Sequence, residues 1–271
     1  ARLVARALRL NRSTFIQTGA ITRQYSFSYL VPVLLGQGSV LLVLPLSVQK
    51  RFLEVDIPKL QQWLNIQKNI TTGNQWPDKF EGILLTTPED WLNNYFKNQQ
   101  NFPAHITTLI DPLDDLETWT RNLLTLQITP QNWNQLLSVC GNNQEQIREI
   151  RIKLTKSLFS RPPNPYQCFL LGDQEQGILY KMLQELNNKT ALSLSWRNFW
   201  QKLHQENQLF WATLNRQQGN FTLHVSPLEV ATTLKSLWQD KTLILIGGFL
   251  DEETSAPLYR QQIGLENTDI T

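Results

Sequence analysis

Short, continuous runs of apolar residues, separated by segments with helical spacing, constrain this chain more than any other feature. Residues 40–45 read Val-Leu-Leu-Val-Leu-Pro, which is the pattern of a parallel strand buried on both faces. Similar runs occur at 14–18, 82–88 and 106–111, and helical segments lie between them. Strand and helix alternate four times within about 115 residues, which predicts an α/β fold with a mostly parallel sheet and helices on both faces.

The regular alternation then stops. Residues 117–205 have helical spacing and are rich in Trp, Gln and Asn, which predicts an all-helical insertion. Strand-like runs return within 210–227 and at 242–248. We therefore expect one α/β domain made of residues 1–116 and 206–271, interrupted by the insertion.

Composition excludes several classes of function. The formal net charge of +2 over 271 residues is too small to indicate a nucleic-acid partner or an acidic substrate by itself. The two Cys and three His have no spacing typical of a zinc or iron–sulfur site. No apolar run has transmembrane length, and no signal-peptide pattern is present. These features predict a cytoplasmic protein without a membrane partner.

The stretch from residue 15 to residue 32 has the layout of a phosphate-binding loop. It reads as a strand, a turn that contains Gly19, and an apolar helix, and such a turn delivers an anion to a helix N-terminus. The Gly-Lys-Ser/Thr that closes a working loop is absent. Two interpretations stay open: Thr18, Gly19, Arg23 and Ser26 bind a nucleotide or another anion, or the loop has this shape without a ligand.

A cluster of carboxylates follows the run at 106–111. Asp111 ends the predicted strand, and Asp114 and Asp115 come shortly after it. Carboxylate oxygens are ligands that Mg²⁺ prefers. The alternative is an exposed strand end where Asp114 or Asp115 caps a helix.

Basic and aromatic residues in the insertion allow contact with nucleic acid. A helical run carries four basic side chains: Arg148, Arg151, Lys153 and Lys156. These either contact a DNA backbone or form a solvated helix face. Five tryptophans either stack on bases or belong to the core: Trp119, Trp133, Trp196, Trp200 and Trp211.

Five segments carry short motifs in a fixed order along the chain. They are Val4–Leu8 with Gln17-Thr18-Gly19 and Tyr29-Leu30-Val31-Pro32; Leu85-Thr86-Thr87-Pro88; Leu109–Leu116; Val225–Val230; and Thr242–Leu250 with Ile263-Gly264-Leu265. Their order and spacing resemble those of the DinG/XPD-type superfamily 2 DNA helicases. The resemblance implies a first RecA-like motor domain of the P-loop NTPase type with an arch-like insertion. It further implies ATP and Mg²⁺ as cofactors, single-stranded DNA as a partner, and a second RecA-like domain after Thr271.

The resemblance also assigns roles to individual residues. Asp111 corresponds to the catalytic, metal-facing carboxylate, and Ser26 corresponds to the hydroxyl that holds Mg²⁺. Thr86 and Thr87 lie in the segment that faces the DNA strand. The nucleotide-binding positions are Thr18, Gly19, Arg23, Gln24, Tyr25 and Ser26.

Several of these positions depart from the helicase pattern. Tyr25 stands where the family has the phosphate-binding Lys, and Gln24 stands where it has the preceding Gly. Pro112 replaces the general-base Glu, and Gly247-Gly248-Phe249 replaces Ser-Ala-Thr. No Cys lies between the first and second motifs, so no iron–sulfur cluster is expected. We therefore expect a degenerate helicase-like protein that binds single-stranded nucleic acid with ATP hydrolysis impaired or lost. The alternative is a non-enzymatic scaffold built on a helicase fold.

Overall fold

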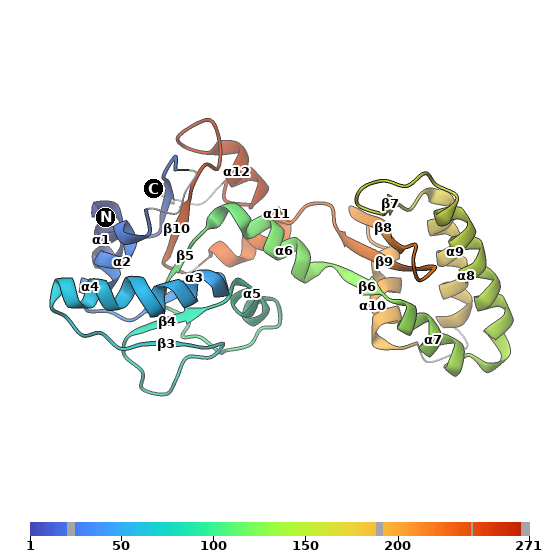
Figure 1. Ribbon diagram of the computed structural model, residues 1–271, viewed down its shortest axis with the longest axis horizontal. Coiled ribbons are helices and arrows are strands. Elements are labelled where there is room, and N and C mark those ends of the chain that lie inside the picture. Colours follow the sequence, from blue (N-terminus) through green and yellow to red (C-terminus); the bar gives the residue numbers. More distant parts are fainter. Residues whose placement is uncertain (21–24, 188–191, 240, 267–271) are drawn as a thin grey trace. The chain divides into compact units, whose positions relative to one another are not determined.

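The chain folds as two compact units (Figure 1). The structure, a computed structural model, describes residues 1–20, 25–187, 192–239 and 241–266. The first unit contains Ala1–Leu123 and Val230–Thr271, and the second contains Leu124–Glu229. The second unit is therefore one continuous segment inserted into the first.

The first unit is built on a six-stranded sheet in which every neighbouring pair of strands is parallel. Its strand order is β1-β10-β5-β2-β4-β3. The strands are β1 (Thr14–Gln17), β2 (Val40–Val43), β3 (Ile70–Thr72), β4 (Ile83–Thr86), β5 (Thr107–Ile110) and β10 (Leu243–Gly247). This confirms the α/β fold and the mostly parallel sheet predicted from the sequence. The edge strand β3 was not predicted, because it is only three residues long.

Helices cover both faces of this sheet, as the continuous apolar strands require. On one face, Val40 and Leu42 pack with side chains of α1 (Arg2–Leu10), α2 (Ser26–Leu35) and α4 (Ile57–Leu64). On the other face, Leu41 and Val43 join a second cluster. The helices that contribute to it are α5 (Pro88–Phe96), α6 (Leu116–Leu124), α11 (Ala231–Leu234) and α12 (Pro257–Gln262).

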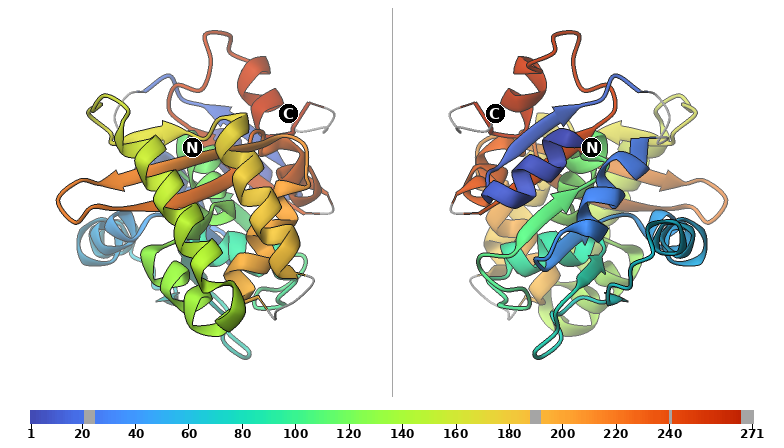
Figure 2. Two further views of the ribbon diagram at one scale, coloured as in Figure 1. Left: turned by 90° about the vertical axis from the view of Figure 1, so that its right-hand side faces the viewer. Right: turned by 90° about the vertical axis from the view of Figure 1, so that its left-hand side faces the viewer.

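The second unit combines an antiparallel sheet with helices. The sheet has the order β6-β9-β8-β7 and consists of β6 (Leu126–Ile128), β7 (Cys168–Leu170), β8 (Gln208–Asn215) and β9 (Asn220–Pro227). Its helices are α7 (Pro130–Val139), α8 (Gln144–Phe159), α9 (Asp173–Asn187) and α10 (Leu194–Leu203). The left view of Figure 2 shows helices lying across the strands of this sheet. Within the described ranges, no helix of either unit has the length and apolar character needed to cross a bilayer.

This sheet corrects the predicted insertion in two ways. The segment is not all-helical, and it runs from Leu124 to Glu229 instead of 117–205. The strands β8 and β9 were assigned to the α/β domain, but they pair with each other as a hairpin and with β6 and β7. Their inward residues alternate along the strand, as in Phe210, Ala212 and Leu214, which is the pattern of a sheet with one buried face.

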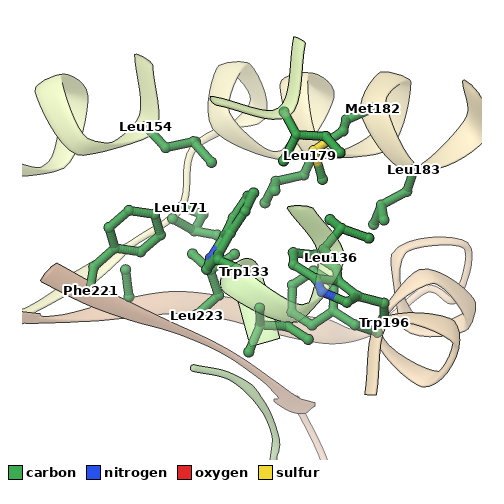
Figure 3. Close-up of a cluster of buried hydrophobic side chains, with 14 of the residues drawn as sticks. Trp133, Leu136, Leu154, Leu171, Leu179, Met182, Leu183, Trp196, Phe221 and Leu223 are labelled. Atoms are coloured by element: carbon green, nitrogen blue, oxygen red, sulfur yellow. The ribbon is translucent and has the colours of Figure 1, made fainter. Parts of the chain in front are cut away.

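The core of the second unit is centred on two tryptophans (Figure 3). Trp133 of α7 and Trp196 of α10 are fully buried, and their ring centroids lie 4.8 Å apart in an edge-to-face arrangement. Aliphatic side chains of α8 and α9 surround them, including Leu154 and Leu183. Of the two interpretations given to these tryptophans, core packing is the one that the structure supports.

Replacement of Trp133 by Ala is therefore expected to destabilise the second unit strongly. The cavity left by a buried tryptophan costs about 3–5 kcal/mol of unfolding free energy. Urea unfolding followed by circular dichroism measures the loss. Trp63→Ala is the control, because Trp63 is 75% exposed and its loss is expected to change stability by less than about 0.5 kcal/mol. Equal effects of the two substitutions would contradict this packing.

Candidate functional site

The carboxyl ends of the parallel strands meet at one edge of the first unit's sheet, which is where open α/β sheets bind ligands. The strand β1 leads into Thr18 and Gly19, β5 leads into Asp111, and β10 ends at Gly247. Because β10 lies between β1 and β5, these three segments are neighbours. The structure thus brings the predicted nucleotide loop and the predicted catalytic carboxylate to the same edge.

Two tyrosine hydroxyls hold the carboxylate of Asp111. The Tyr25 hydroxyl donates to Oδ1 at 2.7 Å, and the Tyr29 hydroxyl donates to Oδ2 at 2.6 Å. Asp111 and Tyr29 are each only 1% exposed. A buried carboxylate needs such donors, because an unsatisfied charge in the interior is costly. Both oxygens of Asp111 therefore already accept hydrogen bonds from this chain's own side chains.

The first backbone N–H groups of the loop also have partners within the protein. The N–H of Thr18 donates to the Gly247 carbonyl at 3.0 Å, and the N–H of Gly19 donates to the Gly248 carbonyl at 2.8 Å. The N–H of Ala20 donates to the Thr18 hydroxyl at 3.3 Å. In a phosphate loop such groups point at the anion. Here the N–H groups of Thr18 and Gly19 extend the pairing between β1 and β10 instead.

Gly248, which follows β10, allows this close pairing. A Cβ on Gly248 would lie 2.5 Å from the carbonyl oxygen of Ala20, which no side chain tolerates. The N–H of Gly248 donates to both carboxylate oxygens of Asp114, at 2.9 and 3.1 Å. Asp114 is therefore engaged by a backbone N–H of the neighbouring loop, which is neither of the two roles predicted for it.

Tyr259 of α12 contacts the segment that follows Asp111. Its hydroxyl donates to the carbonyl oxygen of Leu113. Burial, together with the negative charges of Asp114, Glu117 and Asp115, raises the pKa of Tyr259 well above its ordinary value. The hydroxyl thus remains a proton donor at every physiological pH.

A small cavity of about 220 Å³ remains beside Asp111. It is lined by Ser26, Ser47, Val48, Arg51, Phe52 and Asp111. Arg51, the last residue of α3 (Leu46–Arg51), has its Nε 3.0 Å from Oδ2 of Asp56 and is thus paired. The cavity is smaller than typical pockets for organic ligands, which begin near about 300 Å³. Its volume and polar lining fit water or a small hydrated ion.

The two residues predicted to face Mg²⁺, Ser26 and Asp111, both line this cavity. Mg²⁺ binds through one or two protein oxygens and several waters, so a hydroxyl and a carboxylate are a minimal donor set. Within the part of the chain that the structure describes, no three His, Cys, Asp or Glu side chains form a group that would hold a metal. Asp111, Asp114 and Asp115 therefore do not form such a group.

Sequence reasoning missed the role of Tyr29. Tyr25 and Tyr29 are four residues apart, which places them on one side of a helical turn. The sequence did contain a signal for this contact: two tyrosines with helical spacing, and a predicted strand that ends in a carboxylate. Arg23 and Gln24, which were predicted to bind nucleotide, lie outside the described residues.

Thr86 and Thr87 were predicted to face a DNA strand. In the structure, Thr86 is buried and Thr87 caps a helix. Thr86 is 1% exposed, and its hydroxyl has no hydrogen-bond partner in the described structure. The Thr87 hydroxyl caps α5 by accepting from the N–H of Asp90 at 3.0 Å, which stabilises a helix N-terminus. Neither side chain is presented at the surface as an exposed donor.

The predicted basic residues of the second unit all lie on α8. Arg148, Lys153 and Lys156 are exposed, while Arg151 is half-buried and donates to the side-chain oxygen of Asn134 at 3.0 Å. Three exposed cationic side chains on one helix attract the phosphates of a nucleic acid. The exposed face is mixed, because Glu145 and Glu149 share it near the N-terminus.

Solved structures of XPD helicases share the fold of this chain. A structure of apo XPD matches with a TM-score of 0.56 and 15% identity, and the match covers 94% of this chain and 54% of that one. A second XPD helicase matches with a TM-score of 0.57 and 11% identity, over 97% of this chain and 59% of that one. A truncated XPD matches with a TM-score of 0.52 and 11% identity, over 99% and 97% of the two chains.

These likenesses show that the chain shares the fold of these XPD structures, including an α/β unit with a parallel sheet. The chain spans a little over half the length of the first two structures. No family model and no curated protein matches it.

The hydrogen bonds on Asp111 predict a specific loss of stability. Tyr29→Phe removes a donor from a buried carboxylate, and we expect the unfolding free energy to fall by about 1–3 kcal/mol. Tyr166→Phe is the matched control, since Tyr166 is 85% exposed and its substitution is expected to have little effect. Chemical denaturation of both variants measures the difference. Equal stability of the two variants would show that the Tyr29 hydroxyl does not support Asp111.

Proposed function

We propose that this chain is a degenerate helicase-like protein that binds single-stranded nucleic acid and whose ATP hydrolysis is impaired or lost. The observation that carries the proposal is the state of Asp111. Tyr25, which stands where helicases of the resembled family have the phosphate-binding Lys, uses its hydroxyl to hold this carboxylate. Tyr25, in the position of the family's lysine, thus forms a hydrogen bond with Asp111, in the position of the metal-binding carboxylate.

Three losses at the site act against phosphoryl transfer. Tyr25 brings no positive charge to a transferring phosphoryl group, and Pro112 has no group that orients or deprotonates a water. The N–H groups of Thr18 and Gly19 are already paired, so they are not aimed at a phosphate. Each lost contact of this kind raises an activation barrier by about 3 kcal/mol. Together they support the loss of hydrolysis at helicase-like rates.

The same contacts weaken the case for ATP and Mg²⁺ as cofactors. A Mg²⁺ ion bound to Asp111 competes with the hydroxyl groups of Tyr25 and Tyr29 for the carboxylate oxygens. The cavity beside Asp111 is also small for a nucleotide. In our proposal, ATP and Mg²⁺ are therefore not required for binding to nucleic acid.

Two observations support a nucleic-acid partner. The fold is that of structures described as XPD helicases, and α8 presents Arg148, Lys153 and Lys156 to solvent. Phosphate contacts from such residues are independent of sequence and sensitive to salt. Single strands are the expected ligand, because the resembled family acts on single-stranded DNA.

An ATPase assay tests the catalytic part of the proposal. With a single-stranded oligonucleotide in excess, we expect turnover below about 0.01 per second, compared with the roughly 1–1,000 per second of typical enzymes. Any residual rate is compared with that of Asp111→Asn, which identifies contaminating activity if the two rates agree. Turnover near about 1 per second that disappears in Asp111→Asn would refute the loss of hydrolysis.

A binding titration tests the nucleic-acid part. We expect Lys153→Ala/Lys156→Ala to weaken binding of a labelled single-stranded oligonucleotide. It should also make the plot of log K against log salt shallower by about 1.4, or about 0.7 for each lost phosphate contact. Lys50→Ala/Lys59→Ala removes the same charge from exposed positions in the first unit and should leave the slope unchanged.

The outcome of this titration also distinguishes the two functional classes. Binding that is lost with the α8 lysines but is independent of ATP supports the proposal. Failure of the unmodified chain to bind the oligonucleotide, at low salt and with or without ATP, would instead favour the non-enzymatic scaffold.

A further inference from the structure

A cavity of about 770 Å³ lies in the first unit, away from Asp111. It is bounded by the C-terminal half of α5, the 98–105 loop, the start of β5 and the α11 region. Figure 1 labels α5, β5 and α11. Two lining residues lie just before strands: Ile106 directly precedes β5, and Lys241 is two residues before β10. The cavity thus lies toward the amino ends of the strands, at the opposite edge from Asp111 and Gly247.

The lining of this cavity combines aromatic and amide side chains. Trp91, Tyr95, Phe96 and Phe102 contribute rings, and Asn and Gln side chains are frequent along the 94–100 segment. A volume between about 300 and 1,000 Å³ with an apolar lining and a few polar groups is typical of small-molecule sites. Its size and composition therefore fit an organic ligand that is larger than an inorganic anion.

One ammonium group is fixed in this lining. The Nζ of Lys241 lies 3.9 Å from the centroid of the Tyr95 ring. The Tyr95 hydroxyl donates to the Ser236 carbonyl at 2.8 Å, and the Lys241 carbonyl accepts from the Ser13 hydroxyl at 2.9 Å. Both the ring and the backbone beneath the cation are thus held in place.

This cation lacks a negative partner in the described structure. None of the described residues that line the cavity carries a carboxylate, and Lys241 forms no ion pair with a described residue. Burial lowers the pKa of Lys241, which is the expected effect where desolvation of an ammonium is not compensated by a negative charge. An anion placed in the cavity would offset that penalty.

We propose that this cavity binds a small organic carboxylate that carries an aromatic ring. The carboxylate pairs with the Nζ of Lys241, and the ring packs against Tyr95, Phe96 and Phe102. The amide side chains at the rim supply hydrogen bonds that orient the polar edge of the ligand. This site uses none of the residues assigned to nucleotide or nucleic-acid binding.

The test compares an anionic probe with its neutral analogue on the full chain. Isothermal titration calorimetry measures the binding of 1-naphthylacetate and of 1-naphthylacetamide, which share a ring but differ in charge. We expect the carboxylate to bind more tightly by about tenfold or more. In Lys241→Met this preference should disappear, while binding of the amide changes by less than about twofold.

Two further variants keep the test decisive. Lys235→Met removes an exposed cation that does not line the cavity and should leave both affinities unchanged. Thr233→Trp adds bulk to a lining position and should abolish binding of both probes. Circular dichroism confirms that each variant is folded. Equal binding of the two probes, unchanged binding in Thr233→Trp, or no binding of the carboxylate at about 5 mM would overturn the proposal.

Discussion

The position of β10 between β1 and β5 is the constraint on which the first unit depends. Among the described strands, the edge strand β1 pairs with β10 alone, so the loop that follows β1 is located by residues more than two hundred positions away. The same strand sets the distance between that loop and Asp111 at the end of β5. The geometry of the candidate site therefore depends on the backbone hydrogen bonds of a strand that comes late in the chain.

The first N–H groups of the loop and the carboxylate at this edge of the sheet already have hydrogen-bond partners within the protein. In an open phosphate loop, backbone N–H groups and a lysine are left for a ligand. Here the N–H groups of Thr18 and Gly19 donate to the carbonyls of Gly247 and Gly248 at the end of β10. The hydroxyls of Tyr25 and Tyr29 take the place of a ligand at Asp111. A buried carboxylate with such donors is stable without a metal, which explains how the fold persists around a site that departs from its pattern.

The sequence allowed much of the first unit to be predicted, because its strands are apolar throughout. Val40–Val43 and Leu243–Gly247 are buried at every position, and such runs have few alternatives to a covered parallel sheet. The second unit was harder to predict, because β6 and β7 are only three residues long. In addition, the apolar pattern of β8 and β9 is compatible with a strand of either unit. Only tertiary pairing decides to which sheet such a hairpin belongs.

The site was predicted less completely than the fold. The order of segments placed Thr18, Gly19 and Asp111 at one edge, and that placement is what the structure has. The partners of those groups were not predicted, because a hydrogen bond between Tyr29 and Asp111 depends on how α2 packs against the sheet. Likewise, the contact between Gly248 and Ala20 depends on a close approach of two backbones, which no local pattern encodes.

The insertion of the second unit as one uninterrupted segment has a consequence for synthesis. During translation, all of Leu124–Glu229 emerges from the ribosome before β10 does, so every described strand of the second unit's sheet is available while the first unit still lacks β10. Domains fold as units when their residues are complete. The inner domain is thus ready to fold first, and until β10 arrives the first unit has an unpaired β5 edge and a detached β1. An exposed parallel edge of this kind is where a nascent chain associates wrongly, which makes the interval before the last strand the vulnerable period in the biogenesis of this protein.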